Sequence, residues 1–276
     1  MAPVPGPVPA LSAHPRTPRL VRLVRWSRLV LHLGTAAFLL RFVVPRADPE
    51  QARIIKSRWA ADLLSLLALR LEVEGEPPPA DGRGVLLVGN HVSWVDVFAI
   101  GAVRHTRFVA KSDIRDWPLA GVIAERAGTL FVQRTRRHDT GRTAARVHEA
   151  LAAGDCVGFF PEGTTTEGDR LLKFHSSLFE PAVAHGAPVH PLAIRYLHVD
   201  GTPCRAAAFA GELSFAQSLG LVIRTREIVV KLAFAEPIDP AGLGRREVAA
   251  IARERVAALL GLPPEIPPTP SNVTSP

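Results

Sequence analysis

The chain has 276 residues, of which 47% are apolar and 21% are charged. That length fits one large domain with an appendage, and the composition excludes a chain that is disordered throughout. Two cysteines, Cys156 and Cys204, are too few for a disulfide framework or a cysteine-rich zinc site. We therefore expect an ordinary hydrophobic core in a protein that suits a reducing compartment.

The net charge of +7 and the isoelectric point near 10.3 first suggest a nucleic-acid partner. However, the positive charge is concentrated at one end of the chain. Residues 1–58 hold ten basic and two acidic side chains, a net charge of +8, whereas the remainder holds 23 basic and 24 acidic ones. A basic segment, residues 16–58, that overlaps an apolar run predicts contact with an anionic membrane surface and no nucleic-acid partner.

The N-terminal region begins with a proline-rich stretch and continues into the apolar run Leu29–Val44, which Arg41 interrupts. Because a spanning helix needs about 20 apolar residues, a short inserted or interfacial helix is the first interpretation. A buried helix of a soluble protein is the alternative. A secretory signal is weakly indicated, because no small-residue cleavage site follows. If the segment inserts, its arginines place its N-terminal side in the cytoplasm.

Further along the chain, residues 52–70 carry apolar side chains at helical spacing and predict a helix, and a turn-rich break follows at 76–84. Short apolar runs then alternate with helical patterns. The expected strands are Val85–Val88, Arg107–Ala110, Cys156–Phe160, Val189–Ile194 and Ile228–Phe234. The expected helices lie near 94–103, 118–127, 140–152, 176–185 and 245–260. This alternation predicts an α/β layered fold with a central sheet flanked by helices.

The changes in composition along the chain predict four parts. The first is a disordered proline-rich tail, residues 1–18, and the second is an N-terminal helical membrane-associated segment, residues 19–75. The α/β domain follows at 76–262, and a tail rich in Pro, Ser and Thr closes the chain at 263–276.

The first block that could carry chemistry is Asn-His-Val-Ser-Trp-Val-Asp at 90–96, directly after an expected strand. His91 and Asp96 would point about 140° apart on a regular helix. They can meet if His91 lies in the strand-to-helix loop and Asp96 lies in the first helical turn, with Ser93 as the N-cap. Such a pair forms a general base that activates a hydroxyl group. The alternative is a capping box of Ser93 and Asp96, which would leave His91 an ordinary loop histidine.

A second block, Phe-Pro-Glu-Gly-Thr-Thr-Thr at 160–166, follows another buried strand. Pro161 ends the strand, and Gly163 permits close approach of the backbone. Glu162 is expected at the carboxyl edge of the sheet, where open α/β sheets bind their ligands. The alternative is a polar turn with a solvated glutamate.

Two further blocks are weaker. Lys111 and Arg134 each follow a short apolar run and could hold a phosphate or carboxylate, or could be surface charges in water. The stretch 189–195 could line a pocket. The chain has no H-E-x-x-H, G-x-S-x-G or P-loop motif, and no G-x-G-x-x-G after a strand. Their absence counts against a metalloprotease, a serine hydrolase, a nucleotide triphosphatase and a dinucleotide oxidoreductase.

In this order, the four blocks resemble the glycerolipid acyltransferase family. The family's H-x4-D block matches 90–96, and its lysine stretch leading to G-x-x-F-x-x-R matches 111–134. Its F-P-E-G-T block matches 160–164, and its V-x-P-x-A-I block matches 189–194. The resemblance covers about residues 85–195 and implies a layered acyltransferase-type fold whose central sheet is mixed.

The resemblance implies that His91 removes the proton from a hydroxyl of a lysolipid while Asp96 orients His91. The alkoxide would attack the thioester of acyl-CoA or acyl-ACP, with no metal and no other cofactor. The residues implied for binding the acceptor are Lys111, Arg134, Glu162, Gly163, Thr164 and Thr165. The implied location is the cytoplasmic face of the inner membrane.

One position departs from the family pattern. Thr165 stands where the family often has an arginine that can contact phosphate. Losing a guanidinium removes a bidentate phosphate contact. The acceptor 1-acylglycerol-3-phosphate therefore stays only narrowly ahead of lyso-ornithine lipid, whose head is an amino acid. A non-catalytic lipid-binding protein on the same fold is the alternative from another functional class.

Overall fold

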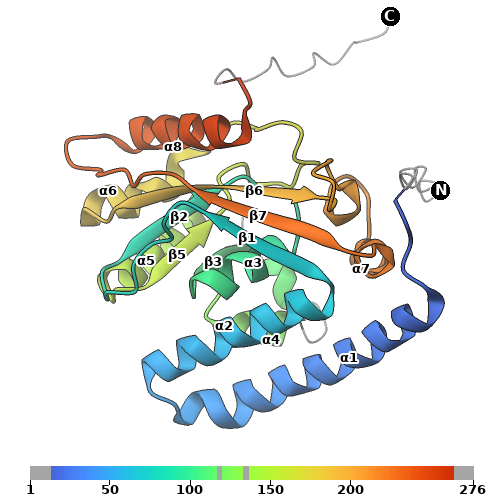
Figure 1. The fold of residues 1–276 in the computed structure, drawn as a ribbon. Helices are drawn as coiled ribbons and strands as arrows, with labels where there is room; N and C mark the ends of the chain where they lie inside the picture. The colour runs from blue at the N-terminus through green and yellow to red at the C-terminus, as the bar shows by residue number, and fades with distance from the viewer. Residues whose placement is uncertain (1–13, 117–119, 133–136, 264–276) are drawn as a thin grey trace, which may run out of the picture.

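The computed structural model describes residues 14–116, 120–132 and 137–263. A seven-stranded sheet lies between two layers of helices (Figure 1). The strands are β1 (Leu69–Glu74), β2 (Val85–Gly89), β3 (Arg107–Lys111), β4 (Leu130–Val132), β5 (Cys156–Phe159), β6 (Val189–Leu197) and β7 (Ile228–Phe234). Their order is β1-β7-β6-β2-β5-β3-β4. Only β6 and β7 pair in the antiparallel sense, which confirms the predicted α/β fold with a mixed central sheet.

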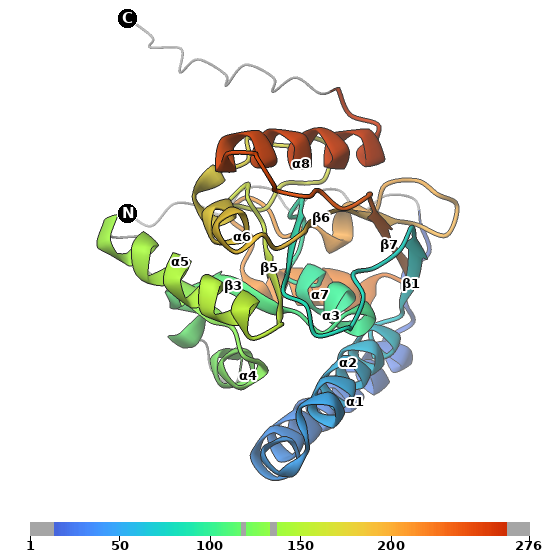
Figure 2. The ribbon, with the colours of Figure 1, turned by 90° about the vertical axis from the view of Figure 1, so that its left-hand side faces the viewer.

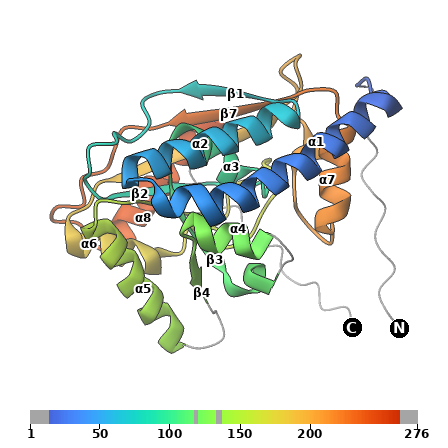
Figure 3. The same ribbon diagram turned by 90° about the horizontal axis from the view of Figure 1, so that it is seen from below.

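The helices divide between the two faces of the sheet, as the two perpendicular views show (Figures 1 and 2). They are α1 (Arg19–Phe38), α2 (Pro49–Leu66), α3 (Asp96–Val103), α4 (Ala120–Ala127), α5 (Arg137–Ala152), α6 (Glu180–His185), α7 (Phe215–Arg224) and α8 (Arg245–Leu260). One hydrophobic cluster joins α2, α3 and α7 to the sheet, and a second joins α5, α6 and α8 to its other face. Seen from below, α1 runs along the outside of α2 (Figure 3).

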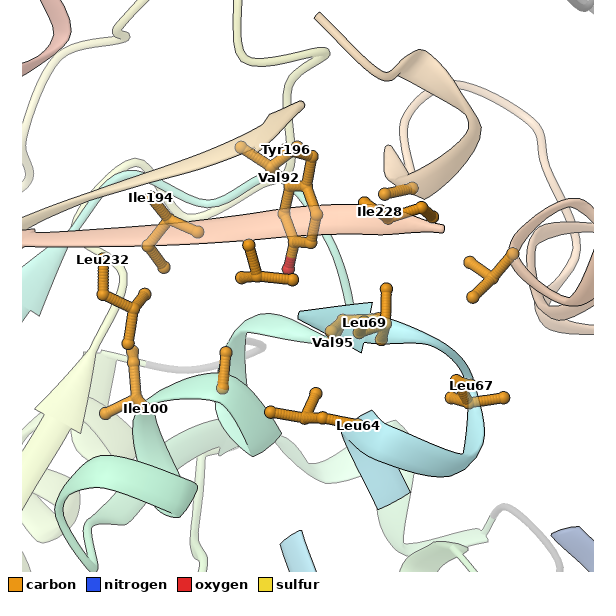
Figure 4. Close-up of a cluster of buried hydrophobic side chains, with 14 of the residues drawn as sticks. Leu64, Leu67, Leu69, Val92, Val95, Ile100, Ile194, Tyr196, Ile228 and Leu232 are labelled. Carbon is orange, nitrogen blue, oxygen red and sulfur yellow. The ribbon is translucent and has the colours of Figure 1, made fainter. Parts of the chain in front are cut away.

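The central strands β2 and β5 are apolar at every position because both of their faces are covered. On β2, Leu87 belongs to the first cluster, while Leu86 and Val88 belong to the second. On β6, Ile194 and Tyr196 face the first cluster (Figure 4). A strand of alternating polarity would have left one face of the sheet in water.

The five expected strands are all present, but several elements differ from the sequence prediction, among them the short strand β4, which was not predicted. The helix expected over 52–70 ends at Leu66, because Ala68 has a positive φ of 55°. The chain then forms β1, which pairs in parallel with β7. Helix α7 was not predicted, although Ser214 and Gln217 form a capping box at its start that the sequence could have signalled.

The N-terminal helix is long and exposed. It continues from α1 through a π turn and a 3-10 turn to Arg46, and it is the one helix of the described residues that is long and apolar enough to cross a membrane. Leu20, Leu31 and Phe38 are 72%, 70% and 58% exposed. The alternative of a buried helix is therefore wrong for this segment.

The predicted division into four parts stays a prediction, with two structural facts bearing on it. Thr17 is buried and its N–H donates to the carbonyl of Arg224 at 2.9 Å, so the ordered chain begins before residue 18. Strand β1 is an edge of the sheet although it lies within the segment 19–75.

Candidate active site

The candidate site lies where β2 and β5 end. These strands are parallel neighbours, so the loops that follow them meet at one edge of the sheet. The backbone N–H of Thr166 donates to the carbonyl of His91 at 2.9 Å, and the N–H of His91 donates to Glu162 Oε1 at the same distance. The loops of the first and second sequence blocks, at 90–96 and 160–166, are therefore hydrogen-bonded to each other.

His91 and Asp96 meet across the start of α3. His91 Nδ1 lies 2.8 Å from Asp96 Oδ2, and the Asp96 side chain is completely buried while that of His91 is 23% exposed. Because His91 precedes the helix and Asp96 begins it, five positions of separation bring the two side chains together. A carboxylate can only accept, so Nδ1 carries a proton, and in the neutral ring Nε2 keeps its lone pair.

Asp96 also holds the loop that leads into the helix. Its Oδ2 accepts from the backbone N–H of Val92 at 2.8 Å and from that of Ser93 at 3.0 Å. The Ser93 hydroxyl accepts from the N–H of Val95, and Val95 rather than Ser93 is the N-cap residue. The prediction of Ser93 as the N-cap is therefore wrong. The predicted capping box of Ser93 and Asp96 is not formed either, because the Ser93 hydroxyl accepts from Val95 and not from Asp96.

An aromatic stack fixes the plane of the imidazole. The His91 ring lies on the ring of Phe160 with centroids 4.0 Å apart and planes within 1°. Phe108 stacks behind Phe160 at 5.9 Å. In the described part of the chain, His91 Nε2 makes no hydrogen bond to the protein. The ring is thus held on one face and one edge, and its free nitrogen is available to a ligand.

Glu162 is buried rather than solvated, with 4% of its surface exposed. Its two carboxylate oxygens accept from the N–H groups of His91 and Leu172 at 2.9 and 2.8 Å. Burial raises the pKa of Glu162, and those two donors act in the opposite direction. The alternative of a solvated glutamate is wrong. In this structure the carboxylate holds two backbone segments together.

Three of the remaining predicted binding residues belong to this loop. Gly163 has a φ of 74°, a conformation that favours glycine, and Thr164 is exposed. The Thr165 hydroxyl donates to the carbonyl of Phe209. Lys111 is exposed at the end of β3, whose parallel pairing with β5 places it at the same edge of the sheet. Arg134 lies outside the described residues.

Two buried polar residues near the site were not predicted to have a role. The Asn90 side chain exchanges two hydrogen bonds with the backbone of Ile194, at 3.0 and 2.8 Å, and so ties the end of β2 to β6. The Tyr196 hydroxyl donates to Asp96 Oδ1 at 2.5 Å. Asn90 directly follows the wholly apolar strand β2, which is a sequence signal for the residue although not for its partner. Tyr196 lies in a strand that also contains His190 and Arg195, so it has no such signal.

Metal binding was not predicted for this chain, and that prediction stays untested. Within the described ranges, no group of three or more His, Cys, Asp or Glu side chains is arranged to hold a metal ion.

Comparisons with known proteins converge on one family. The family model named Acyltransferase matches residues 70–195, which include both loops of the site. A lyso-ornithine lipid O-acyltransferase of Pseudomonas aeruginosa is 39% identical over 248 residues, which cover 88% of this chain and 94% of the relative. A 1-acyl-sn-glycerol-3-phosphate acyltransferase of Neisseria meningitidis is 36% identical over 80% of this chain and 85% of the relative.

A solved structure also resembles this chain. The 1-acyl-sn-glycerophosphate acyltransferase PlsC of Thermotoga maritima superposes with a TM-score of 0.65 at 22% sequence identity, covering 88% of this chain and 94% of that one. At that identity the likeness concerns the fold.

Proposed function

The chain belongs to the acyltransferase family and is an acyltransferase, and we propose that His91 is its general base and Asp96 the residue that orients it. The acceptor in this proposal is the free hydroxyl of a lysolipid, and the donor is a fatty acyl thioester. The observation that carries the proposal is the contact between His91 Nδ1 and the buried Asp96 carboxylate, at 2.8 Å, which leaves Nε2 free. A neutral imidazole with one free nitrogen is suited to act as a general base.

The reaction follows from that geometry in balanced steps. His91 Nε2 takes the proton of the acceptor hydroxyl as its oxygen attacks the thioester carbonyl. The carbon–sulfur bond breaks, an ester forms, and the departing thiolate takes the proton back from the imidazolium. Asp96 stabilises the imidazolium in between, because its carboxylate accepts from Nδ1–H. In this proposal acyl-CoA or acyl-ACP is the co-substrate, and the reaction needs no cofactor.

Lyso-ornithine lipid is the first candidate acceptor. Two observations support it: the first relative above carries that name, and Thr165 offers no cation to a phosphate. The Thr165 hydroxyl is engaged with the carbonyl of Phe209, so this side chain closes the loop instead of reaching for a headgroup. The sequence by itself favoured the phosphate acceptor narrowly, and these observations reverse the order.

The second candidate acceptor is 1-acylglycerol-3-phosphate, which would give phosphatidic acid. The Neisseria relative carries that activity in its name. The exposed cations Arg170 and Lys173 follow the Glu162 loop closely in the chain and offer charge to a phosphate. Lys111 and Arg134 are further cations for the polar head, with Gly163 and Thr164 providing backbone and hydroxyl contacts.

We place the protein on a membrane, with the basic segment 16–58 toward anionic lipids on the cytoplasmic face. The exposed apolar side chains of α1 support this placement, since their burial in lipid is favourable. Aromatic contacts connect α1 to the catalytic helix. The His32 ring stacks on Trp59 of α2 at 4.6 Å, and Trp59 meets Phe98 of α3 edge-on at 6.0 Å. The segment that would enter the lipid is thus packed onto the helix that begins with Asp96.

The test is acyl transfer by the detergent-solubilised full chain. Both acceptors are offered with labelled acyl-CoA and, separately, with acyl-ACP, and kcat/KM is compared for each pair. His91→Ala should abolish product, whereas His175→Ala, a change at an exposed histidine, should leave transfer unchanged. Full transfer by His91→Ala would refute the mechanism. Binding of a lysolipid without product from any donor would favour a non-catalytic lipid-binding protein.

A further inference from the structure

The two oxygens of Asp96 are held in different ways. Oδ2 accepts from the His91 ring and from the backbone N–H groups of Val92 and Ser93, all within the same loop. Within the described residues, Oδ1 has one donor, the hydroxyl of Tyr196 at 2.5 Å. Tyr196 is 100 positions away on β6, so the second oxygen is fixed by the sheet rather than by the loop.

The place of Tyr196 is set by backbone pairing on both sides. Strand β6 pairs in parallel with β2, which ends just before the catalytic loop, and in antiparallel fashion with β7, where Tyr196 lies opposite Val230. The Asn90 side chain extends the first pairing by bonding the backbone of Ile194 in both directions. Because strand side chains alternate, Tyr196 shares the face of Ile194 and points toward α3 (Figure 4).

Burial makes this contact energetically important. Asp96 is completely buried, and Tyr196 is 5% exposed within the hydrophobic cluster. A carboxylate oxygen without a donor is costly in such surroundings. Burial, and then the neighbouring Asp96 charge, raise the pKa of Tyr196 well above its ordinary value. The phenol therefore keeps its proton at neutral pH and remains a donor.

We propose that Tyr196 is a positioning residue of the acyl-transfer reaction: it fixes the rotation of the Asp96 carboxylate so that Oδ2 faces His91. This proposal rests on the role given to His91 and Asp96 above. Tyr196 touches neither substrate nor His91 in it and acts through Asp96, although its hydroxyl also meets the Ser93 side chain. No sequence block that carries the family resemblance includes this residue.

The kinetic test is Tyr196→Phe, which keeps the ring and removes the hydroxyl. We expect kcat to fall about ten- to a hundredfold, with KM for donor and acceptor unchanged within about twofold. The matched control is Ile194→Val, which alters packing on the same face of β6 without a polar change, and it should leave kcat unchanged. A loss of kcat as large in Ile194→Val as in Tyr196→Phe would reduce Tyr196 to a packing residue.

A double-mutant comparison isolates the path through Asp96. In an Asp96→Ala background, adding Tyr196→Phe should change kcat by less than about twofold, because the carboxylate it positions is gone. Asp96→Asn gives the same comparison if the alanine variant folds poorly. An equal loss with and without the Asp96 carboxylate would overturn the proposal, as would full activity of Tyr196→Phe in the unaltered background.

A spectroscopic measurement separates this proposal from the proposed function. Tyr196 is the only tyrosine of the chain, so phenolate absorbance during a pH titration reports this residue alone. In Asp96→Asn the titration should move to lower pH, with circular dichroism showing that the fold persists. An unchanged titration would mean that the hydroxyl does not contact Asp96. A shifted titration together with an active His91→Ala variant would instead refute the catalytic role of the pair and leave the contact standing.

Discussion

Asp96 at the start of α3 is completely buried and both of its oxygens accept hydrogen bonds, whereas Leu20, Leu31 and Phe38 on α1 are 72%, 70% and 58% exposed. The loop after β2 depends on hydrogen bonds that the folded protein already makes internally. The N-terminal arm, which we define as α1 and α2, offers a surface that the rest of the protein leaves uncovered. A substitution in the loop should therefore change turnover alone, and one on the outer face of α1 should change membrane binding alone.

The largest effect is expected for His91→Ala. Removing the general base should lower kcat by about 10³-fold. Partition of the variant onto anionic vesicles should equal that of the unaltered protein, because the ring lies against Phe160 and away from the outer face of α1. The measurements are single-turnover acyl transfer and vesicle sedimentation. If the variant also left the vesicles, the site and the membrane surface would not be separate regions.

The reverse experiment places charges on the outer face of α1. Leu31→Glu combined with Phe38→Glu removes two exposed apolar side chains, each contributing about 1.5–3 kcal/mol when buried in lipid. We expect vesicle affinity to fall about a hundredfold or more, while turnover on detergent-dispersed substrate stays within about threefold.

The matched control for those charges is Ala250→Glu combined with Ala258→Glu, at exposed positions of α8 on the opposite side of the sheet (Figure 1). It adds the same two carboxylates without touching the arm, and vesicle affinity should not change. A comparable loss of affinity with this control would show that net charge, and not the apolar face of α1, governs binding.

The parts of the molecule that were predictable are those set by local pattern. The buried strands β2, β5, β6 and β7 appear as short apolar runs because helices cover both of their faces. The meeting of His91 with Asp96 also follows from local order, since a loop residue and a first-turn residue are close in any strand-to-helix connection. Strand β1 was not predicted, because a helical spacing of leucines continues into it at Leu63, Leu66, Leu67 and Leu71. The positive φ of Ala68, which ends the helix, is not visible in that spacing.

The parts that were not predictable depend on distant segments. Tyr196 reaches Asp96 and Asn90 reaches Ile194 only after β6 has been placed beside β2, and no spacing in the sequence encodes that neighbour. Arg25 is the same kind of case. It belongs to the arginine series assigned to the membrane, yet its guanidinium donates to carbonyls about 200 positions away.

A smaller effect is expected where the arm meets the body, at His105. Burial, and then the Lys56 charge on α2, lower the pKa of His105 to about 4, with Arg53 and Arg104 acting in the same direction and Asp155 opposing them. Because the unfolded chain takes up the proton near pH 6.5, the free energy of unfolding should fall as pH falls. The His105 contribution to that fall is about 2 kcal/mol between pH 7 and pH 5.

The measurement is denaturant unfolding at several pH values. His105→Gln, which cannot titrate, should show a flatter dependence on pH than the unaltered chain, and His175→Gln at an exposed position should not. Equal slopes for all three proteins would mean that His105 is not held neutral between arm and body.

The smallest effect distinguishes Arg25 from Arg28, two arginines of the same basic segment. Arg25 donates to the carbonyls of Ile223, Thr225 and Arg226, at 3.0, 2.7 and 2.7 Å, where a cation at the end of α7 also meets the helix dipole. Arg28 is exposed on the next turn of the same helix. Arg25→Ala should lower the free energy of unfolding by about 1 kcal/mol, with little effect of salt.

Arg28→Ala should leave the stability unchanged and weaken binding to anionic vesicles by about 1 kcal/mol, an effect that added salt removes. Reversed results would mean that Arg25 faces the lipid and that the docking of α1 on α7 is not part of the membrane-bound protein. The expected results would show that a single helix serves both purposes. Arg25 on its inner side stabilises the fold through hydrogen bonds, and Arg28 on its outer side binds the anionic membrane surface.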